Sequence, residues 1–147
     1  MGFSLSSTHT IFFIASIIIA SAVSGVFMAV TTNVSTSLSE RGDRLQEQLN
    51  TDFEIINDPD HIPTSGSNYV FYLKNTGENR LITTNETFQL FIDGNIILET
   101  NYNFSNNNIY PGYVTTIYVD NSEILPGDHI LRIVGPQGIE DEFTFTI

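Results

Sequence analysis

An uncharged apolar run near the start of the chain limits what this protein can fold into more than any other feature. The run, IFFIASIIIASAVSGVFMAV, extends over the 20 residues from Ile11 to Val30. A helix of that length covers about 30 Å, which is the hydrocarbon thickness of a bilayer. Its isoleucine, phenylalanine and valine side chains together favour insertion by about 3 to 7 kcal/mol. The run therefore predicts a transmembrane helix.

A cleaved signal peptide is the alternative interpretation of this run. Ala20 and Ala22 resemble a cleavage site, but residues 1–10 contain no Lys or Arg, whereas a signal peptide begins with a basic region. A processed pilin or archaellin leader would also need basic residues before its cleaved bond. The apolar run continues for eight residues past Ala22. We therefore expect an uncleaved anchor.

Small residues recur every four positions within the run, at Ser21, Gly25 and Ala29. In a helix these positions share one face, and a face of small residues lets two helix backbones approach closely in lipid. Small residues are also common in membrane helices that make no such contact. The stripe is a candidate site of transmembrane helix packing, and a purely lipid-facing helix is the open alternative.

The segment after the run predicts that the same helix continues to Leu49. No proline interrupts it, Glu40 and Arg44 form an i, i+4 charge pair, and Gly42 is a weak point. We expect residues 1–50 to form a transmembrane helix with a helical stalk. Four aliphatic residues suit either an amphipathic stalk or a short coiled coil, and they are Val34, Leu38, Leu45 and Leu49.

Beyond residue 50 the hydrophobic period changes from that of a helix to that of a strand. Short alternating runs lie about ten residues apart, separated by turn sequences such as DGN at 93–95. Gly77 and Gly127 are expected to supply positive φ at turns. The pattern predicts an immunoglobulin-like antiparallel β-sandwich over residues 51–147. The expected strands are 53–57, 68–75, 81–83, 87–93, 96–104, 114–119, 129–134 and 142–147.

The composition and the motifs offer no catalytic or metal-binding set. The formal net charge is −12, which disfavours nucleic acid as a partner, and there is no cysteine to act as nucleophile or metal ligand. We expect no enzyme, no cofactor, no metal and no small-molecule substrate. The three histidines do not form a metal-ligand motif with one another, and they are His9, His61 and His129.

Acidic residues cluster at three places in the predicted sandwich. Loop carboxylates can bind calcium, but a spaced series of ligands is missing. We expect these side chains to lie in solvated turns. They are Asp58 and Asp60, then Asp93, and then Glu140, Asp141 and Glu142.

Three N-x-S/T sequons, at Asn33, Asn85 and Asn103, are candidate N-glycosylation sites. Some sequons arise by chance in a chain that is rich in asparagine. They favour an extracytoplasmic domain to a small degree.

Two features of the sandwich sequence suit contact with another protein. The last strand places Phe143, Phe145 and Ile147 on one face, which we expect inside the core, and an exposed edge near it is the alternative. Exposed aromatic residues are the second possibility, and they are Tyr72, Tyr102, Tyr110 and Tyr113.

Several segments together resemble the archaellum accessory proteins of the FlaG family and, less closely, the related FlaF family. The resemblance extends over nearly the whole chain, and TDFEIINDP is its most specific part. The matching segments are SLSSTHTIFFIASIIIASAVSGV, SLSERGDRLQEQLNTDFEIINDP, YLKNTG, LFIDG, YPGYVTTIYV and LPGDHILRI.

The resemblance implies a non-enzymatic stator or adaptor of the archaeal motility apparatus. Such proteins carry one N-terminal membrane helix and a β-sandwich outside the cytoplasmic membrane, and they hold the archaellum motor against the cell envelope. The partners that it implies are the membrane, further copies of the same protein and a FlaF-type stator protein that contacts the surface layer. The family has no catalytic residues to carry over.

Alternative functions and an opposing topology signal remain open. A subunit of the archaellum or of a type IV pilus-like filament has the same order of helix and sandwich, and a ligand- or calcium-binding surface module is a third class. Arg41 and Arg44 follow the span, where the positive-inside rule alone would place the cytoplasm. Two charges are a thin bias, and the sandwich, the sequons and the family resemblance favour an extracytoplasmic domain.

Overall fold

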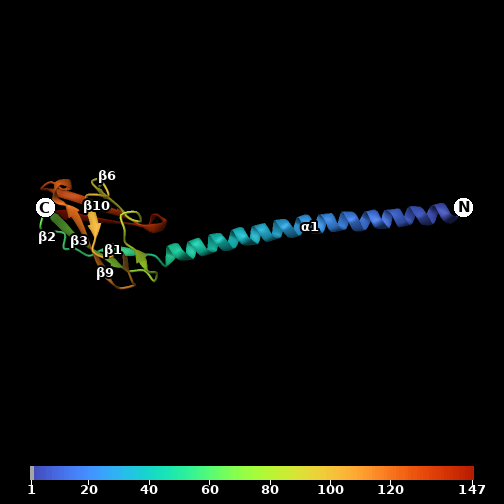
Figure 1. The fold of residues 1–147 in the computed structure, drawn as a ribbon, viewed down its shortest axis with the longest axis horizontal. Helices are drawn as coiled ribbons and strands as arrows, with labels where there is room; N and C mark the ends of the chain where they lie inside the picture. Colours follow the sequence, from blue (N-terminus) through green and yellow to red (C-terminus); the bar gives the residue numbers. More distant parts are fainter. Residues whose placement is uncertain (1) are drawn as a thin grey trace. The chain divides into compact units, whose positions relative to one another are not determined.

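The computed structural model describes residues 2–147, with side chains from residue 6 onward. Within this range one long helix is followed by eleven short strands (Figure 1). The chain divides into two compact units, Met1–Arg44 and Leu45–Ile147. The last turn of the helix therefore belongs to the second unit, together with all the strands.

Helix α1 contains 48 residues, Gly2–Leu49, and is drawn as one continuous ribbon in Figure 1. Several of its serine and threonine hydroxyl groups donate to the carbonyl oxygen four residues earlier, so these side chains are satisfied within the helix. Ser16 donates to Phe12 at 2.7 Å and Thr32 donates to Met28 at 2.8 Å. The predicted long N-terminal helix is confirmed, and it passes through Gly42 without a break.

The strands occupy the part of the chain where apolar and polar residues alternate. Alternation places successive side chains on opposite faces, so that one face of each strand can be buried. The strands are β1 Phe53–Ile55, β2 Thr64–Ser65, β3 Asn68–Asn75, β4 Leu81–Ile82, β5 Gln89–Ile92, β6 Asn95–Ile96, β7 Tyr102–Phe104, β8 Asn108–Ile109, β9 Val114–Asp120, β10 Asp128–Val134 and β11 Glu140–Thr146.

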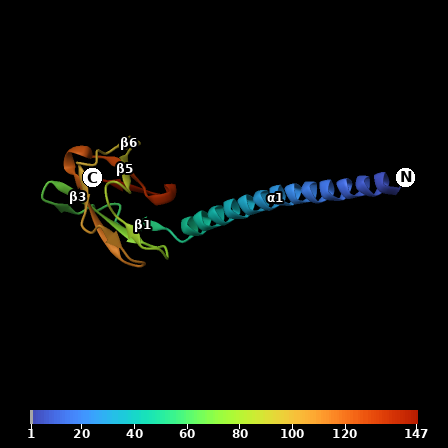
Figure 2. The same ribbon diagram turned by 45° about the vertical axis from the view of Figure 1, so that its right-hand side comes forward.

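Two antiparallel sheets make up the sandwich. The five-stranded sheet has the order β1-β3-β9-β7, with β2 also paired to β3, and the four-stranded sheet has the order β11-β10-β5-β6. In the turned view of Figure 2, β5 and β6 lie together, apart from β1 and β3. A short ladder of β4 and β8 completes the domain. The predicted fold class is confirmed.

The core lies between the two sheets and is built from their inward-facing residues. Phe71 of β3 and Phe145 of β11 bridge the sheets, with ring centroids 5.2 Å apart and planes at 73°. Burying a large apolar side chain contributes about 1.5–3 kcal/mol. The expectation that the last strand faces the core is confirmed, because Phe145 is 1% exposed. Phe143 and Ile147 are partly buried against the same core.

The predicted strand 96–104 is wrong. Its first residue ends β6, and its last three residues form β7 in the other sheet. Between them a turn is closed by the amide of Asn101, which donates to the carbonyl of Leu98 at 2.9 Å. Apolar alternation continues through this turn, so the sequence pattern does not reveal that the chain crosses between sheets. The strands β2 and β8 also lie in segments expected to be loop.

Candidate functional site

The apolar run of α1 exposes its large side chains. Phe12, Ile18 and Phe27 are 67%, 63% and 72% exposed. In the part of the chain that the structure describes, the helix from Ser6 to Leu49 is long and apolar enough to cross a membrane, by length and composition. A bilayer would remove this apolar surface from water. The helix therefore suits a single-pass membrane anchor.

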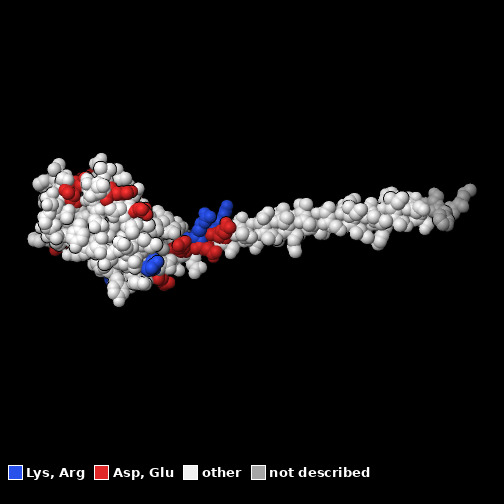
Figure 3. Space-filling model, in the orientation of Figure 1, with Lys and Arg blue, Asp and Glu red and all other residues white. Residues whose placement is uncertain are grey.

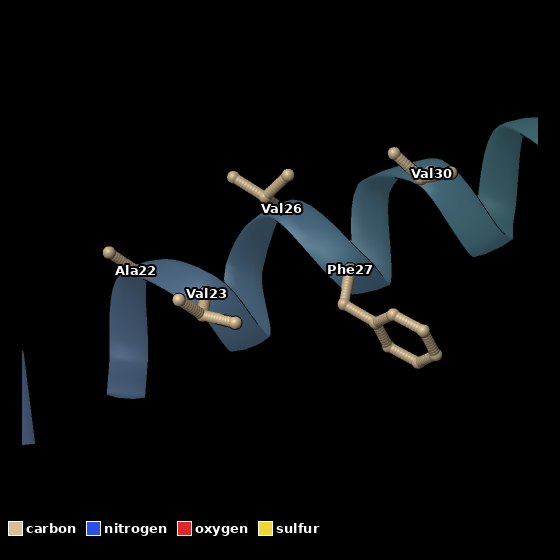
Figure 4. A pocket seen from close by; sticks show the side chains of 5 residues that line it. All are labelled: Ala22, Val23, Val26, Phe27 and Val30. Atoms are coloured by element: carbon tan, nitrogen blue, oxygen red, sulfur yellow. The ribbon is translucent and has the colours of Figure 1, made fainter. Parts of the chain in front are cut away.

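A shallow hollow of about 500 Å³ runs along this part of the helix (Figure 4). Ridges of side chains four residues apart form its sides, as on any α-helix. Its aliphatic and aromatic lining suits lipid chains or the apolar side chains of a neighbouring helix. The lining residues are Ala22, Val23, Val26, Phe27 and Val30.

The small-residue stripe lies beside this hollow, one position earlier in each turn. Ser21, Gly25 and Ala29 are exposed. The hydroxyl of Ser21 donates to the carbonyl of Ile17 at 2.7 Å, so it needs no partner from another helix. A Cβ at Gly25 would have no atom within 4 Å. The stripe is thus free to receive a second helix, and helix association through it stays a prediction.

The stalk part of α1 carries all the charges of the helix. On the face of the helix that Figure 3 shows, blue and red atoms lie only in its C-terminal part, and the sequence has no Asp, Glu, Lys or Arg before Glu40. The apolar stalk residues Val34, Leu38 and Leu45 are 53%, 64% and 56% exposed. The charged residues are Glu40, Arg41, Asp43, Arg44 and Glu47.

A set of backbone hydrogen bonds, here called the junction clasp, holds the residues that follow α1. Thr76 and Gly77 donate their amides to the carbonyl of Asp52 at 3.1 and 3.0 Å. Glu78 and Asn79 donate theirs to the carbonyl of Asn50 at 2.8 and 3.0 Å. The turn after β3 therefore fixes residues 50–52 to the sandwich.

Gly77 has a different role in this clasp from the one expected. It is absent from the glycines with positive φ, whereas Gly127 has φ 140° as expected. A Cβ at position 77 would lie 2.5 Å from the amide nitrogen of Asp52 and 2.6 Å from the carbonyl oxygen of Asn50. The sequence prediction for Gly77 is therefore wrong, because glycine is needed here for close backbone approach.

Asn75, at the end of β3, completes the clasp from inside the domain. Its side chain is fully buried. Its Nδ2 donates to the carbonyls of Asn79 at 2.8 Å and Ile109 at 3.2 Å, and its Oδ1 accepts from the amide of Gly77 at 3.0 Å. Sequence analysis missed this residue, although the triplet Asn-Thr-Gly after a strand was the available signal.

The three sequon asparagines lie in different surroundings. Asn33 is exposed on α1, and Asn103 is exposed on β7. Asn85 is half-buried in the loop between β4 and β5. Its Nδ2 donates to the carbonyls of Glu99 at 2.6 Å and Tyr102 at 2.9 Å. Glycosylation at all three positions stays a prediction.

His129 connects two loops at one end of the four-stranded sheet. Its Nδ1 lies 2.6 Å from Oδ2 of Asp93, and its Nε2 lies 2.6 Å from the carbonyl oxygen of Leu125. Both partners are acceptors, so the ring has a proton on each nitrogen when both bonds form. The hydrogen bond that His129 donates to Asp93 raises the pKa of His129 and lowers the pKa of Asp93.

Two expectations about surface groups need correction. Tyr102 is not an exposed contact residue, because it is 3% exposed and its hydroxyl donates to the carbonyl of Phe88 at 2.7 Å. Tyr110 and Tyr113 are 58% and 69% exposed, and Tyr72 is 36% exposed.

The carboxylates at 140–142 lie on strand β11 rather than in a turn. Asp141 accepts from the amide of Ile55 at 2.8 Å and so joins the edge of β11 to β1. Asp93 does lie in a turn, where it also accepts from the amide of Ile130 at 2.9 Å. Among the described residues, no group of three or more His, Cys, Asp or Glu could hold a metal ion.

Comparison of the sequence with known proteins identifies relatives along nearly the whole chain. The model of the archaeal-type flagellin family matches residues 2–145. Flagella-related protein G of Methanocaldococcus jannaschii is 34% identical over 142 residues, which cover 92% of this chain and 91% of that protein. Flagella-related protein G of Methanococcus voltae is 33% identical over 129 residues, covering 87% of this chain and 72% of that protein.

Two solved structures from Sulfolobus acidocaldarius are also similar. The archaellum periplasmic stator protein FlaG has a TM-score of 0.49 and 23% identity, covering 65% of this chain and 99% of that chain. The complex of the archaellum periplasmic stator proteins FlaF and FlaG gives a TM-score of 0.48 and 21% identity, covering 63% of this chain and 87% of that chain.

An apolar N-terminal helix on an antiparallel sandwich, with relatives named for the flagellum, defines the class as that of archaellum components. The chain belongs to the archaeal-type flagellin family and, within it, is a relative of the flagella-related G proteins. The resemblance to FlaG that the sequence segments carry is thereby confirmed.

Proposed function

We propose that this chain is a non-enzymatic stator or adaptor that holds the archaellum motor against the cell envelope. The helix crosses the cytoplasmic membrane once, and the sandwich lies outside it. The observation that carries the proposal is the continuity of α1, which joins the apolar run to the junction clasp without a break. The division into residues 1–50 and 51–147 remains part of this proposal.

A stator has to resist torque. In this proposal the N-terminal helix holds the chain in the membrane, and the sandwich keeps it from turning. A single helix in a fluid bilayer can rotate and diffuse, so the membrane alone does not hold it. The outer domain must therefore bind something fixed. We propose further copies of this chain and a FlaF-type protein as those partners, with the surface layer reached through the latter.

Deletion and complementation test the proposal directly. A strain without this chain should assemble the filament subunits but fail to swim, and the full-length chain should restore swimming. Normal motility in the deletion strain would contradict the proposed stator role.

The interaction with the proposed partner needs a soluble fragment that keeps the clasp. A fragment from Leu45 retains residues 50–52 and also Gln48, whose Nε2 donates to the carbonyl of Gln137 at 3.2 Å. This fragment, immobilised, should retain a FlaF-type protein from an envelope extract. Retention of archaellins in its place would favour a filament role.

A subunit of the filament is the second candidate function, because the matching family is named for flagellins. N-terminal sequencing of the protein from cells separates the two candidates. A start at Met1 or Gly2 fits the anchor, whereas a start inside the run from Ile11 to Val30 fits a processed filament subunit.

The extracytoplasmic position of the sandwich has its own test. Protease treatment of whole cells should remove the domain from residue 51 onward. Protection of that domain in whole cells, with digestion after lysis, would place it in the cytosol, as Arg41 and Arg44 suggest by the positive-inside rule.

A further inference from the structure

Two sequons lie close together in the sandwich, but their asparagines are bonded in opposite ways. Both amide hydrogens of Asn85 are in use, one on the carbonyl of Glu99 and one on the carbonyl of Tyr102. Tyr102 belongs to β7, the edge strand of the five-stranded sheet, and its hydroxyl reaches back to the carbonyl of Asn85 at 3.4 Å. Asn85 therefore fastens the loop before β5 to that edge.

A glycan on Asn85 is incompatible with this arrangement. A side-chain amide has two hydrogens on its nitrogen, and attachment of a sugar replaces one of them. One of the two bonds from Nδ2 must then break, and the sugar must fit where Glu99 or Tyr102 now lies. This conflict concerns the glycosylated product, so it applies whether transfer takes place before or after folding.

Asn103 has no such conflict. It is exposed on β7, and its Oδ1 accepts from the amide of Phe104 at 2.9 Å. No hydrogen bond joins its Nδ2 to any other described residue. The cross-strand neighbour of Asn103 is Tyr118 of β9, which offers an aromatic ring beside it on the outer face of the five-stranded sheet.

A polar groove of about 210 Å³ adjoins Asn103 on this face. Amide, hydroxyl and carboxylate side chains around an aromatic ring are groups that hydrogen-bond and stack with a sugar. The lining residues are Asn68, Thr100, Asn101, Tyr102, Asn103, Tyr118 and Asp120.

We infer that Asn103 is the glycan acceptor of the sandwich and that the sequon at Asn85 stays unmodified. The inference rests on the extracytoplasmic position in the proposed function. The donor is an oligosaccharide on a lipid phosphate. The Nδ2 of Asn103 forms a bond to C1 of the sugar, the bond from C1 to the phosphate oxygen breaks, and the displaced amide proton leaves with the phosphate. Asn33, on α1, is a separate prediction.

A glycan at Asn103 also divides the surface of the domain. The first sugar lies against Tyr118 and covers that end of the outer face of the five-stranded sheet.

Mass spectrometry of peptides from the full-length protein, purified from its own cells, tests the inference. The peptide with Asn103 should carry a sugar mass, and the peptide with Asn85 should have its unmodified mass. A modified Asn85 or an unmodified Asn103 would overturn the inference.

Variants of the full chain provide the matched comparison. Asn103→Gln should remove the glycan of the sandwich. Asn107→Gln, at an exposed asparagine outside any sequon, should keep the glycan, so that the intact mass changes only by the substitution itself. An unchanged glycan mass in Asn103→Gln contradicts the assignment. The stator role is tested by the swimming of the deletion strain, and the glycan assignment is tested by mass. A failed glycan assignment can therefore be told apart from a failed stator role.

Discussion

At the scale of single residues, the junction depends on a position that has no room for a side chain. The backbone of residues 50–52 passes so close to Gly77 that a Cβ would lie 2.5 Å from a backbone nitrogen. Backbone atoms in a clasp of four hydrogen bonds cannot move aside as the end of a flexible side chain can. The sequence signal for this position pointed to a turn, because Asn-Thr-Gly is typical of turns, and the close approach depends on a segment 25 residues earlier.

We expect Gly77→Ala to lower the free energy of unfolding of the Leu45–Ile147 unit by about 1–3 kcal/mol, which is the usual cost of overpacking. The midpoint of chemical unfolding, followed by tyrosine fluorescence, measures it. Gly42→Ala in the full chain is the control, because a Cβ there meets nothing within 4 Å and alanine favours a helix. Equal stability of Gly77→Ala and wild type would refute the clasp.

His129 should make the stability of the sandwich depend on pH. Its pKa is raised in the folded state by Asp93, by the carbonyl of Leu125 and by the charge of Asp128. A raised pKa stabilises the folded state fully below the unfolded pKa of about 6.5, and this contribution is lost as the pH rises through the folded pKa. The Tm difference between wild type and His129→Gln should therefore shrink on the alkaline side. A Tm difference that stays constant from pH 5 to 9 would show that protonated His129 does not stabilise the folded state.

Residues such as Asn85 show why part of the site could not be predicted from the sequence. Asn85 and Asn103 both begin an N-x-S/T sequon, so the sequence alone presents both as modification sites. The acceptors that occupy the amide of Asn85 lie 14 and 17 residues further along the chain. They reach it because β7 joins the other sheet, and the sequence pattern gave no sign of that crossing.

At the scale of elements, local pattern and length decided which predictions were correct. Strand β3 was predicted at its observed bounds, residues 68–75, because alternation is clean and turns flank it. Helix α1 was predictable because a long apolar run continues without proline into a charged helical segment. The 96–104 prediction failed because the residues of the Leu98–Asn101 turn keep the strand pattern.

Strand β11 packs one face against the core, so removing the side chain of one core residue on this strand should have a large effect on stability. Phe145→Ala should destabilise the sandwich by about 3–5 kcal/mol, because Phe145 is 1% exposed and packs edge-to-face on Phe71. Thermal unfolding of the Leu45–Ile147 unit measures this loss. Thr144→Ala, at the exposed neighbour on the same strand, should change stability by less than about 0.5 kcal/mol. Similar effects of the two changes would contradict the assigned face.

The small-residue stripe predicts self-association of α1. Gly25→Leu should weaken association in lipid vesicles by about 1 kcal/mol, or roughly fivefold, because a larger side chain separates the backbones. Energy transfer between labelled full-length chains measures it. Ile18→Leu, outside the stripe, is the matched control. If Gly25→Leu associates as wild type does, the helix packs through another face or not at all.

At the scale of the whole molecule, the proposed stator role makes the length of the segment between the apolar run and the sandwich important. The stalk from residue 31 to Leu49 continues α1, and as a helix it covers about 28 Å. A stator needs this segment as a spacer, whereas a simple tether does not depend on its exact length.

Deletion of residues 36–42 should abolish or strongly reduce swimming while the protein remains in the membrane. The deletion removes two helical turns, or about 10 Å, and leaves the apolar run, the Asn33 sequon and the clasp intact. Swimming in soft agar and immunoblots of the membrane fraction measure the two effects. Replacement of the same seven residues by alanines is the length-matched control and should support swimming. Normal swimming of cells that carry the shortened chain would show that the stalk acts only as a tether whose length does not matter.

The junction clasp has a consequence for how such proteins diverge. Its four donors and two acceptors are peptide groups, so mutations that exchange the side chains of Asn50, Asp52, Thr76 and Glu78 leave the bonding scheme in place. Apart from Asn75 and Gly77, the four backbone bonds tolerate any residue other than proline at the donor positions. Substitutions on the outer surface of the sandwich can therefore accumulate while the attachment of residues 50–52 stays the same.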